Sequence, residues 1–447
     1  MRSHSIVLCA LLWAFPALAQ SDRGTITGTV SDPAGAVVAS AAVNARNVET
    51  GIEYPVATSA TGNYTIPQLP AGTYEVAVTV PGFKKYVRQG LQVQVAQILR
   101  IDISLEVGTT TDTITVMGAA SLLNTESADV SHSVTASNMN DLPILGIGAS
   151  QAGSSGIRNP YAVAELIPGT LWQANAQVRV NGAPGNTQSF RVEGMDASNS
   201  GTPGTAAQNQ PSVDSIEEFA IQTSNYAAEY GQVGGGVFNV TMRSGTNQFH
   251  GSAYDYFVNE AFNAGNPYTD APAGTGNPRP RNRRNDYGFT VGGPVWIPKL
   301  YNGHDKTFFF FNWEQYRERV DINNQLETVP TAAYRQGDFT TAMIGNPIGT
   351  DPLGRPIYQG EIYDPNTTRG AASGQVVRDP FPNNQIPISR FDPVAAKIQS
   401  LFPQPLGPNA NAVVNNFIPD IPTSRVTSIP SVKIDQAIGA RGKLSFF

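Results

Sequence analysis

Residues Ser212 to Tyr256 read SVDSIEEFAIQTSNYAAEYGQVGGGVFNVTMRSGTNQFHGSAYDY, and this stretch decides the fold. Its opening sets apolar residues among carboxylates, which predicts a short strand or helical turn with one buried face. Three consecutive glycines, Gly234 to Gly236, remove every Cβ, as close backbone packing requires. A strict alternation follows and predicts a strand. Its two faces are Phe238, Val240 and Met242 on one side and Asn239, Thr241 and Arg243 on the other.

A second alternating run follows the turn formed by Ser244 to Asn247. One of its faces is largely aromatic and the other is small or polar. Strands of outer-membrane barrels present such an aromatic face to lipid and the other face to the lumen. We therefore expect a junction between a soluble domain and a membrane barrel here. The lipid face would carry Tyr254, Tyr256 and Val258, and the lumen face Gly251, Ala253 and Asp255.

The segments SIEEFAIQTSNYAAEYG and GGGVFNVTMRSGTNQFHGS resemble the end of the plug and the first barrel strand of TonB-dependent outer-membrane receptors of the Oar-like type. The alternative is an unrelated glycine-rich β-protein, but the flanking segments fit the family in the right order. The resemblance implies an outer-membrane location and contact with outer-membrane lipid. It also implies TonB, with ExbB and ExbD, as partner, and an extracellular ligand such as an oligosaccharide, peptide or metal chelate.

The first residues, 1 to 19, have the pattern of a secretory signal peptide. Arg2 supplies the positive charge, Ile6 to Phe15 the apolar region, and Ala17-Leu18-Ala19 a small-x-small cleavage site. A short membrane anchor is the alternative, but the apolar run is too short to span a bilayer. The only cysteine, Cys9, lies within this segment, so the mature chain would have neither disulfides nor thiolate metal sites.

Composition and motifs exclude several classes of function. The net charge of -6 gives no reason to expect a nucleic-acid partner. None of the histidines (His4, His132, His250 and His304) begins a zinc motif, and no phosphate-binding loop, dinucleotide fingerprint or nucleophile elbow is present. We therefore expect no catalytic residue, no metal, no cofactor and no enzymatic activity.

Residues 20 to 106 contain short β-rich runs separated by turn signals, as in TYEVAVTV followed by Pro81-Gly82. Roughly seven short strands at this spacing predict an antiparallel Greek-key β-sandwich. The runs GTVSDPAGAVVASAAV and TGNYTIPQLPAGTYEVAVTVPGF resemble the carboxypeptidase-regulatory-like domain. The resemblance implies a structural or interaction module rather than a peptidase.

Residues 107 to 141 are predicted to be a linker, because they are rich in Thr, Ser and Ala and poor in large apolar groups. Within it the run Asp112, Thr113, Ile114, Thr115, Val116 and Met117 resembles the TonB box, an extended segment that pairs edge-on with a strand of TonB. Its β-branched residues favour such an extended conformation. The alternative is that the run finishes the sandwich or forms an idle strand.

Residues 142 to 245 are expected to form a mixed α/β plug domain. Ala162 to Thr170 predicts a short helical stretch, and Gln177 to Gly182 and Phe190 to Asp196 predict strands. A polar loop, Ala197 to Gln210, has a composition suited to hydrogen-bonding a polar ligand. The candidate ligand-binding residues are Trp172, Asn175, Asn186, Asn199 and Gln208.

Residues 246 to 447 are expected to begin an antiparallel transmembrane β-barrel with a long extracellular loop from Asp321 to Pro430. Phe309, Phe311 and Trp313 alternate with other side chains, and FDPVAAKIQSLFP predicts one helix in the loop. A receptor barrel of this type has about 22 strands, and this chain supplies about four to six. The expectation is therefore an incomplete barrel and an N-terminal fragment. A complete small barrel ending at Phe447 is the alternative.

The mainly β fold class and the order of the segments predict a TonB-dependent outer-membrane receptor or transporter. It would take up a ligand too large for porins and be energised through TonB. The rival prediction is a non-transporting outer-membrane or surface protein that serves in binding or adhesion. A working TonB box with a full barrel downstream distinguishes the two.

Overall fold

The computed structural model has a mainly β chain, and no helix among its described residues is long and apolar enough to cross a membrane. The chain forms two compact units. The first comprises residues up to Val258, Arg284–Arg317 and Arg425–Phe447, and the second Asn259–Arg283 and Glu318–Ser424. The described residues are 23–117, 126–141, 158–172, 178–185, 187–198, 210–228, 230–231, 233–262, 281–322, 326–372, 374–406, 409–419, 421–439 and 442–447. The predicted signal peptide lies outside them.

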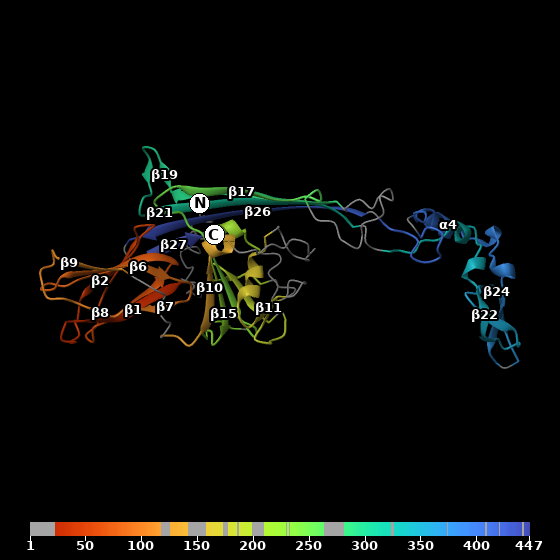
Figure 1. The fold of residues 1–447 in the computed structure, drawn as a ribbon, viewed down its shortest axis with the longest axis horizontal. Helices are drawn as coiled ribbons and strands as arrows, with labels where there is room; N and C mark the ends of the chain where they lie inside the picture. The colour runs from red at the N-terminus through yellow and green to blue at the C-terminus, as the bar shows by residue number, and fades with distance from the viewer. Residues whose placement is uncertain are drawn as a thin grey trace, which may run out of the picture. The chain divides into compact units, whose positions relative to one another are not determined.

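The N-terminal part of the first unit is a β-sandwich (Figure 1). One sheet has the order β4-β1-β7, with β8 also on β1, and the other has the order β3-β2-β5-β6-β9. The inward side chains alternate along each strand and close one core that includes Ile26, Tyr64, Tyr74 and Val78. The strands are β1 (Gly24–Ser31), β2 (Ala42–Asn47), β3 (Glu53–Ala57), β4 (Asn63–Leu69), β5 (Gly72–Thr79), β6 (Lys85–Val93), β7 (Ile98–Arg100), β8 (Ile103–Ser104) and β9 (Thr113–Met117).

The sandwich departs from the antiparallel arrangement expected from the sequence. Strands β7 and β8 run parallel to β1, and β9 runs parallel to β6. Alternation fixes which side chains are buried but does not specify the direction of the neighbouring strand. Next to β7 the backbone of Ile101 approaches β1 so closely that only glycine fits at position 28. A Cβ added at Gly28 would lie 1.8 Å from the carbonyl oxygen of Ile101.

The middle of the first unit is a separate central domain. Its sheet has the order β10-β15-β16-β13-β14, with β11 and β12 paired beside it. Its core is aromatic: Phe190 stacks on Phe238, with centroids 4.9 Å apart, and Tyr161 contacts Phe190 edge-on. The elements are β10 (Val130–Thr135), α2 (Ala136–Asp141), η1 (Pro160–Leu166), β11 (Thr170–Trp172), β12 (Val178–Val180), β13 (Ser189–Val192), β14 (Met195–Asp196), η2 (Val213–Ser215), β15 (Ile216–Ser224) and β16 (Val237–Met242).

The predicted short helical stretch and the predicted strands of this domain are present as η1, β12, β13, β14, β15 and β16. The glycine run also packs tightly: Gly236 has φ +93, and a Cβ there would lie 3.0 Å from the carbonyl oxygen of Gln222. The stretch predicted as a linker contributes a strand to each side, β9 to the sandwich and β10 to the central sheet. The sequence did not predict these pairings, because both strands are half exposed and therefore have a polar composition similar to that of a linker.

The rest of the first unit is the C-terminal sheet, with strand order β17-β18-β21-β26-β27 (Figure 1). Its strands are β17 (His250–Val258), β18 (Asn282–Pro294), β21 (Thr307–Ile322), β26 (Ile421–Ile438) and β27 (Gly442–Phe446). The outer face is apolar and exposed, and it includes Phe257, Phe289, Val291, Leu444 and Phe446. The inner face buries polar groups, including Arg284, Asp286, Asn312, Glu314, Lys433 and Asp435.

The two faces of β17 are the reverse of the expected ones. Tyr254 and Tyr256 lie on the inner face, half buried, whereas Gly251, Ala253 and Asp255 are exposed. The inner placement has a physical cause, because the Arg158 guanidinium of the central domain lies over both tyrosine rings. The alternation itself was predicted correctly, and the assignment of its aromatic face to lipid was wrong.

The second unit is built from short elements. The predicted helix is present as α4 (Pro393–Ser400), whose N-cap Asp392 accepts hydrogen bonds from the backbone of Val394 and Ala395. Two hairpins, β22 with β23 and β24 with β25, form the strands of this unit. The remaining elements are α3 (Ala332–Arg335), η3 (Thr340–Ala342), β22 (Ile344–Thr350), β23 (Pro356–Gln359), β24 (Tyr363–Gly370), β25 (Val376–Pro380), η4 (Pro382–Asn384) and η5 (Ile388–Arg390).

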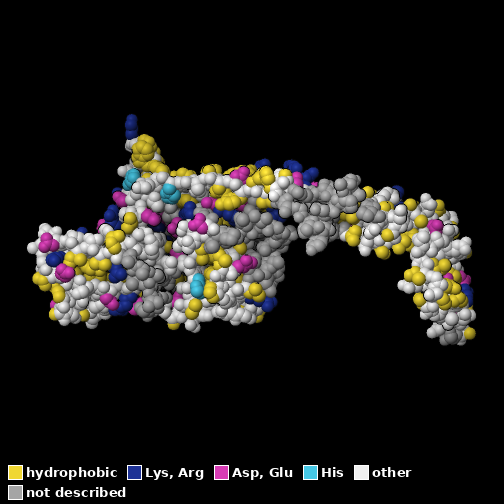
Figure 2. Space-filling view, viewed as in Figure 1, with side chains coloured by type: hydrophobic (Ala, Val, Ile, Leu, Met, Phe, Trp, Pro, Cys, Tyr) yellow, Lys and Arg dark blue, Asp and Glu magenta, His cyan; other side chains and the backbone are white. Residues whose placement is uncertain are grey.

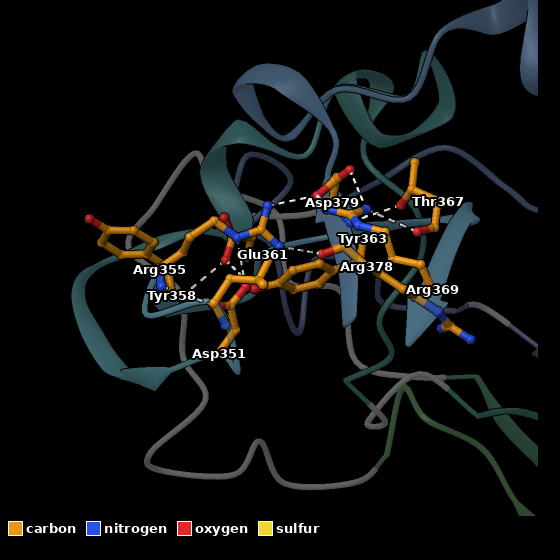
Figure 3. Close-up of polar contacts among 10 residues, drawn as sticks. Asp351, Arg355, Tyr358, Glu361, Tyr363, Thr367, Arg369, Arg378 and Asp379 are labelled. Carbon is orange, nitrogen blue, oxygen red and sulfur yellow. Dashed lines mark hydrogen bonds and ion pairs between the residues drawn. The ribbon is translucent and has the colours of Figure 1, made fainter. Parts of the chain in front are cut away.

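An ion network, which we call the hairpin brace, joins the two hairpins (Figure 3). Asp379 of β25 accepts two bonds from Arg369, at 2.7 and 2.8 Å, and one from Arg355 at 2.6 Å. Arg355 also donates to Asp351 at 2.7 Å. Hydrogen bonds from Arg369 and then Arg355 hold the pKa of Asp379 well below its usual range. The network gives this loop-rich unit a fixed internal geometry.

Candidate functional site

The central domain meets the inner face of the C-terminal sheet through two buried polar clusters, and we call these contacts the docking seam. The first is the arginine cluster. Arg158, just before η1, forms an ion pair with Asp214 of η2, and the two residues are 5% and 7% exposed. The guanidinium carbon lies 4.8 Å from the ring centroid of Tyr254 and 4.2 Å from that of Tyr256. One side chain therefore holds a partner in its own domain and two rings of β17.

Glu314 of β21 completes the arginine cluster. Its Oε2 accepts hydrogen bonds from Tyr254 and from Ser212, each at 2.6 Å. Glu314 is 4% exposed, so these bonds replace the water that a free carboxylate would hold. Bonds to a buried charge of this kind are stronger than bonds between neutral groups. The contact thus depends on charged groups that are costly to separate.

The second part of the seam is the lysine cluster. Lys433 of β26 lies 2.7 Å from Glu193, which sits in the turn between β13 and β14, and it donates to the carbonyl oxygen of Met242 at 2.9 Å. Glu193 also accepts from the backbone of Met242 at 2.7 Å. Beside them Asp435 accepts from Ser244 at 2.6 Å. The end of β16 is therefore bound to β26 by buried charged hydrogen bonds.

A cavity of about 400 Å³ lies beside the lysine cluster. Its wall mixes charges of both signs and includes Glu217, Arg243, Lys433, Asp435 and Lys443. Burial, with partial compensation from Arg243, raises the pKa of Glu217. A polar cavity of this size gives the seam room for water rather than a close-packed apolar contact.

Glu218 of β15 links the central domain to the sandwich. Its Oε2 accepts a hydrogen bond from the backbone N–H of Val95 at 3.0 Å, and its Oε1 accepts one from Ser133. Burial raises its pKa to about 7, against the opposing effect of these two bonds. The sandwich contact therefore depends on a carboxyl group that titrates near neutral pH.

The six residues that resemble a TonB box lie at the edge of the sandwich. Thr113–Met117 form β9, the last strand of the sheet, and within the described ranges of the chain β9 pairs with β6 alone. Lys85 donates its backbone N–H to the carbonyl oxygen of Asp112 at 2.8 Å. Alternation along a parallel pair then directs the backbone groups of Thr113, Thr115 and Met117 away from β6. These residues are exposed, and no strand of the described residues pairs with this edge of β9.

The proposed ligand-binding residues are not brought together by anything described. Asn175, Asn186, Asn199 and Gln208 lie outside the described residues, and of Trp172 only the backbone, at the end of β11, is described. The residues of the docking seam were missed by sequence reasoning. Arg158 and Asp214 stand 56 positions apart and carry no motif. The one available signal was the alternating polar face of β21, which places Asn312 and Glu314 on the same side.

Two parts of the chain match known domain families. Residues 25–106 match the carboxypeptidase regulatory-like domain family, and residues 241–447 match the outer membrane beta barrel domain family. The TonB-dependent transporter Oar of Myxococcus xanthus is 30% identical over 355 residues, which cover 76% of this chain and 32% of Oar. The chain thus spans about a third of the length of that relative.

Two solved siderophore receptors also resemble part of the chain. PirA of Pseudomonas aeruginosa is 15% identical, covering 43% of this chain and 30% of that one, with a TM-score of 0.27. PirA of Acinetobacter baumannii is 18% identical, covering 44% and 25%, also with a TM-score of 0.27.

A polar inner face, an apolar outer face and the matched domain together define an outer-membrane β-barrel protein with an N-terminal carboxypeptidase regulatory-like domain. The protein is located in the outer membrane. Within that class the chain is a homologue of Oar, which is a TonB-dependent transporter.

Proposed function

We propose that the protein is a TonB-dependent receptor that takes up a ligand too large for porins. In this proposal the central domain is the plug, and the C-terminal sheet is the part of the barrel wall on which it docks. The observation that carries the proposal is the docking seam. Its contacts across the two parts are buried polar ones, such as the ion pair of Lys433 with Glu193 and the hydrogen bond from Ser212 to Glu314, which are strong in place yet leave polar surfaces when separated.

The same proposal assigns Asp112 to Met117 as the contact for TonB, acting with ExbB and ExbD. The open edge of β9 supports it, because strand addition needs a row of available backbone donors and acceptors. A TonB strand would extend the sandwich sheet beyond β9. Force applied there would reach the plug through the segment that joins β9 to β10. The ligand, whether an oligosaccharide, a peptide or a metal chelate, would bind at the plug loops that hold Trp172, Asn175, Asn186, Asn199 and Gln208.

Proline variants of β9 test this assignment. Thr115→Pro removes a donor on the open edge, and Ile114→Pro removes one that faces β6. We expect Thr115→Pro to lower binding of a purified TonB C-terminal domain while the sandwich unfolds at the parent's urea concentration. Thr111→Pro, in the turn before β9, is the control and should bind normally. Parent-like TonB binding by both Thr115→Pro and Ile114→Pro would place the TonB contact elsewhere.

A transport assay separates the proposal from its rival. A receptor should lose ligand uptake in Thr115→Pro cells but keep ligand binding at the surface, since the plug loops are untouched. A non-transporting binding or adhesion protein should bind its ligand equally in parent and variant cells and accumulate none in either. Equal accumulation in both would contradict energising through β9.

A further inference from the structure

The connection between β18 and β21 forms a small hairpin of its own, which projects from the end of the C-terminal sheet. It contains β19 (Trp296–Ile297) and β20 (Tyr301–Asn302), which pair with each other. Its base is closed by bonds from Val295 to Thr307 at 2.8 Å and from Gly303 to Val295 at 2.9 Å. At its tip Lys299 has φ +66, and Leu300 donates to Ile297 at 3.0 Å. The chain uses more residues here than a tight strand connection requires.

The hairpin exposes large apolar side chains. Trp296 is 57% exposed, Ile297 47%, Leu300 79% and Tyr301 38%. Hydrophobic side chains gather there in the space-filling view, at the place where Figure 1 labels β19. A patch of this kind on a projecting hairpin marks an interaction surface.

The second leg of the hairpin, residues 305 to 307, is held at its base by hydrogen bonds to neighbouring segments. Ala437 of β26 donates to the carbonyl oxygen of Lys306 at 2.7 Å, and Thr307 donates to Gln436 at 2.6 Å. On the other side Asn247 and Asp305 exchange two bonds, at 2.7 and 2.9 Å. The second leg of the hairpin is therefore tied to neighbouring parts of the first unit on two sides.

The patch continues the lipid-facing side of the sheet. Phe249, 61% exposed, packs against Phe309 with centroids 6.4 Å apart, and Phe289 packs against Phe311 at 5.8 Å. These rings lie on the outer face of an outer-membrane barrel domain and hence toward hydrocarbon. The strand connections at the hairpin end, 295–306 and 439–441, are short, and those at the other end, 259–281 and 323–420, are long. Short connections mark the periplasmic end of such barrels.

We propose that this hairpin inserts into the inner leaflet of the outer membrane as an interfacial foot. Trp296, Ile297 and Leu300 enter the boundary between headgroups and acyl chains, where tryptophan side chains are favoured. Lys299 at the tip extends to the phosphate of an anionic phospholipid. Phospholipid is the occupant because the patch is continuous with the lipid face and carries a cation at its tip.

The chain suits a direct test, since Cys9 is its only cysteine and lies in the predicted signal peptide. In a Cys9→Ser background, nitroxide labels are placed at Leu300→Cys and at Val37→Cys, a sandwich residue that is 51% exposed. The full protein is studied in outer-membrane vesicles. The label at 300 should collide more with oxygen than with a water-soluble nickel complex, and the label at 37 should show the opposite preference. Equal nickel access at both positions would overturn the proposal.

Two further measurements distinguish lipid from a second copy of the chain and test the role of Lys299. Dipolar broadening between labels at 300 would show a second copy on the patch and overturn the lipid assignment. Lys299→Glu should raise nickel access at 300 about twofold in reconstituted vesicles that contain phosphatidylglycerol, and less in pure phosphatidylcholine. Lys397→Glu, an exposed lysine of α4, is the matched control and should change neither. An unchanged signal for Lys299→Glu in both lipids would remove Lys299 from the proposal.

Discussion

Arg158 contacts groups from two parts of the first unit, with Asp214 as its ion-pair partner and the rings of Tyr254 and Tyr256 beneath its guanidinium. A planar guanidinium can form a forked ion pair and stack on a ring at the same time, whereas an ammonium cannot do both. Arg158 therefore holds the central domain against β17 through its ring contacts as well as through its charge.

Replacing this residue gives the first prediction. Arg158→Met leaves the Asp214 carboxylate buried without its ion pair and should destabilise the docked domain by about 3–5 kcal/mol. Arg158→Lys should fall between that variant and the parent. The measurement is the urea concentration at which the central domain becomes protease-sensitive in outer-membrane vesicles. Arg179→Met, an exposed arginine of β12, is the control, and a parent-like midpoint for Arg158→Met would contradict the role given to the cluster.

Glu218 gives a prediction about pH. Its pKa of about 7 lies above the value near 4.3 of an unfolded chain, so between these values only the folded state holds the proton. The resulting stabilisation is complete below about pH 4 and is lost as the pH rises through about 7, a change of about 4 kcal/mol. The free energy of unfolding, measured with urea at pH 5 and at pH 8, gives this difference in stability. Glu218→Gln should flatten the difference, and an undiminished difference in that variant would assign the pH dependence to another group.

At the scale of elements, the hairpin brace predicts resistance to acid. The folded-state pKa of Asp379 is depressed, so its contribution is present above the unfolded value near 3.9 and is lost only as the pH falls well below that value. Asp379→Asn should release Arg355 and Arg369 and make β22 to β25 more sensitive to protease at pH 7. Glu318→Gln serves as a charge-matched substitution elsewhere in the second unit. Parent-like cleavage of Asp379→Asn would show that the hairpins stay joined without the brace.

The sequence predicted the individual strands and helices better than it predicted which elements pack against them. Alternation located β16, β17 and β21, and the run FDPVAAKIQSLFP located α4, because both signals are local. It misassigned the aromatic face of β17, since alternation states which residues share a face and not what covers it. The cover is Arg158, a residue 96 positions before Tyr254. Strand β9 was recognised as extended, but its pairing with β6 depends on a contact that the local sequence does not encode.

At the scale of the whole molecule, the sandwich has its own core and should fold when separated from the rest. Val116 of β9 packs against that core, so the domain includes residues beyond Glu106. We predict that a fragment Gly24–Met117 is more stable than Gly24–Glu106 by about 1–2 kcal/mol, the value of a partly buried valine and its strand. Urea unfolding of both fragments tests this. Val116→Ala in the longer fragment should remove part of this extra stability, and equal midpoints of the two fragments would mean that β9 is only loosely attached.

The parallel pairing of β9 with β6 also has a mechanical consequence. A strand pulled along its own axis loads all its interstrand hydrogen bonds together, whereas a strand peeled sideways breaks them one at a time. Five residues of β9 are in register with β6, from Thr113 on Lys85 to Met117 on Gln89. Tension applied along the chain at this strand would therefore meet shear resistance first. The sandwich would transmit tension that acts along β9, and it would release this strand only when the force acts perpendicular to the strand, across the sheet.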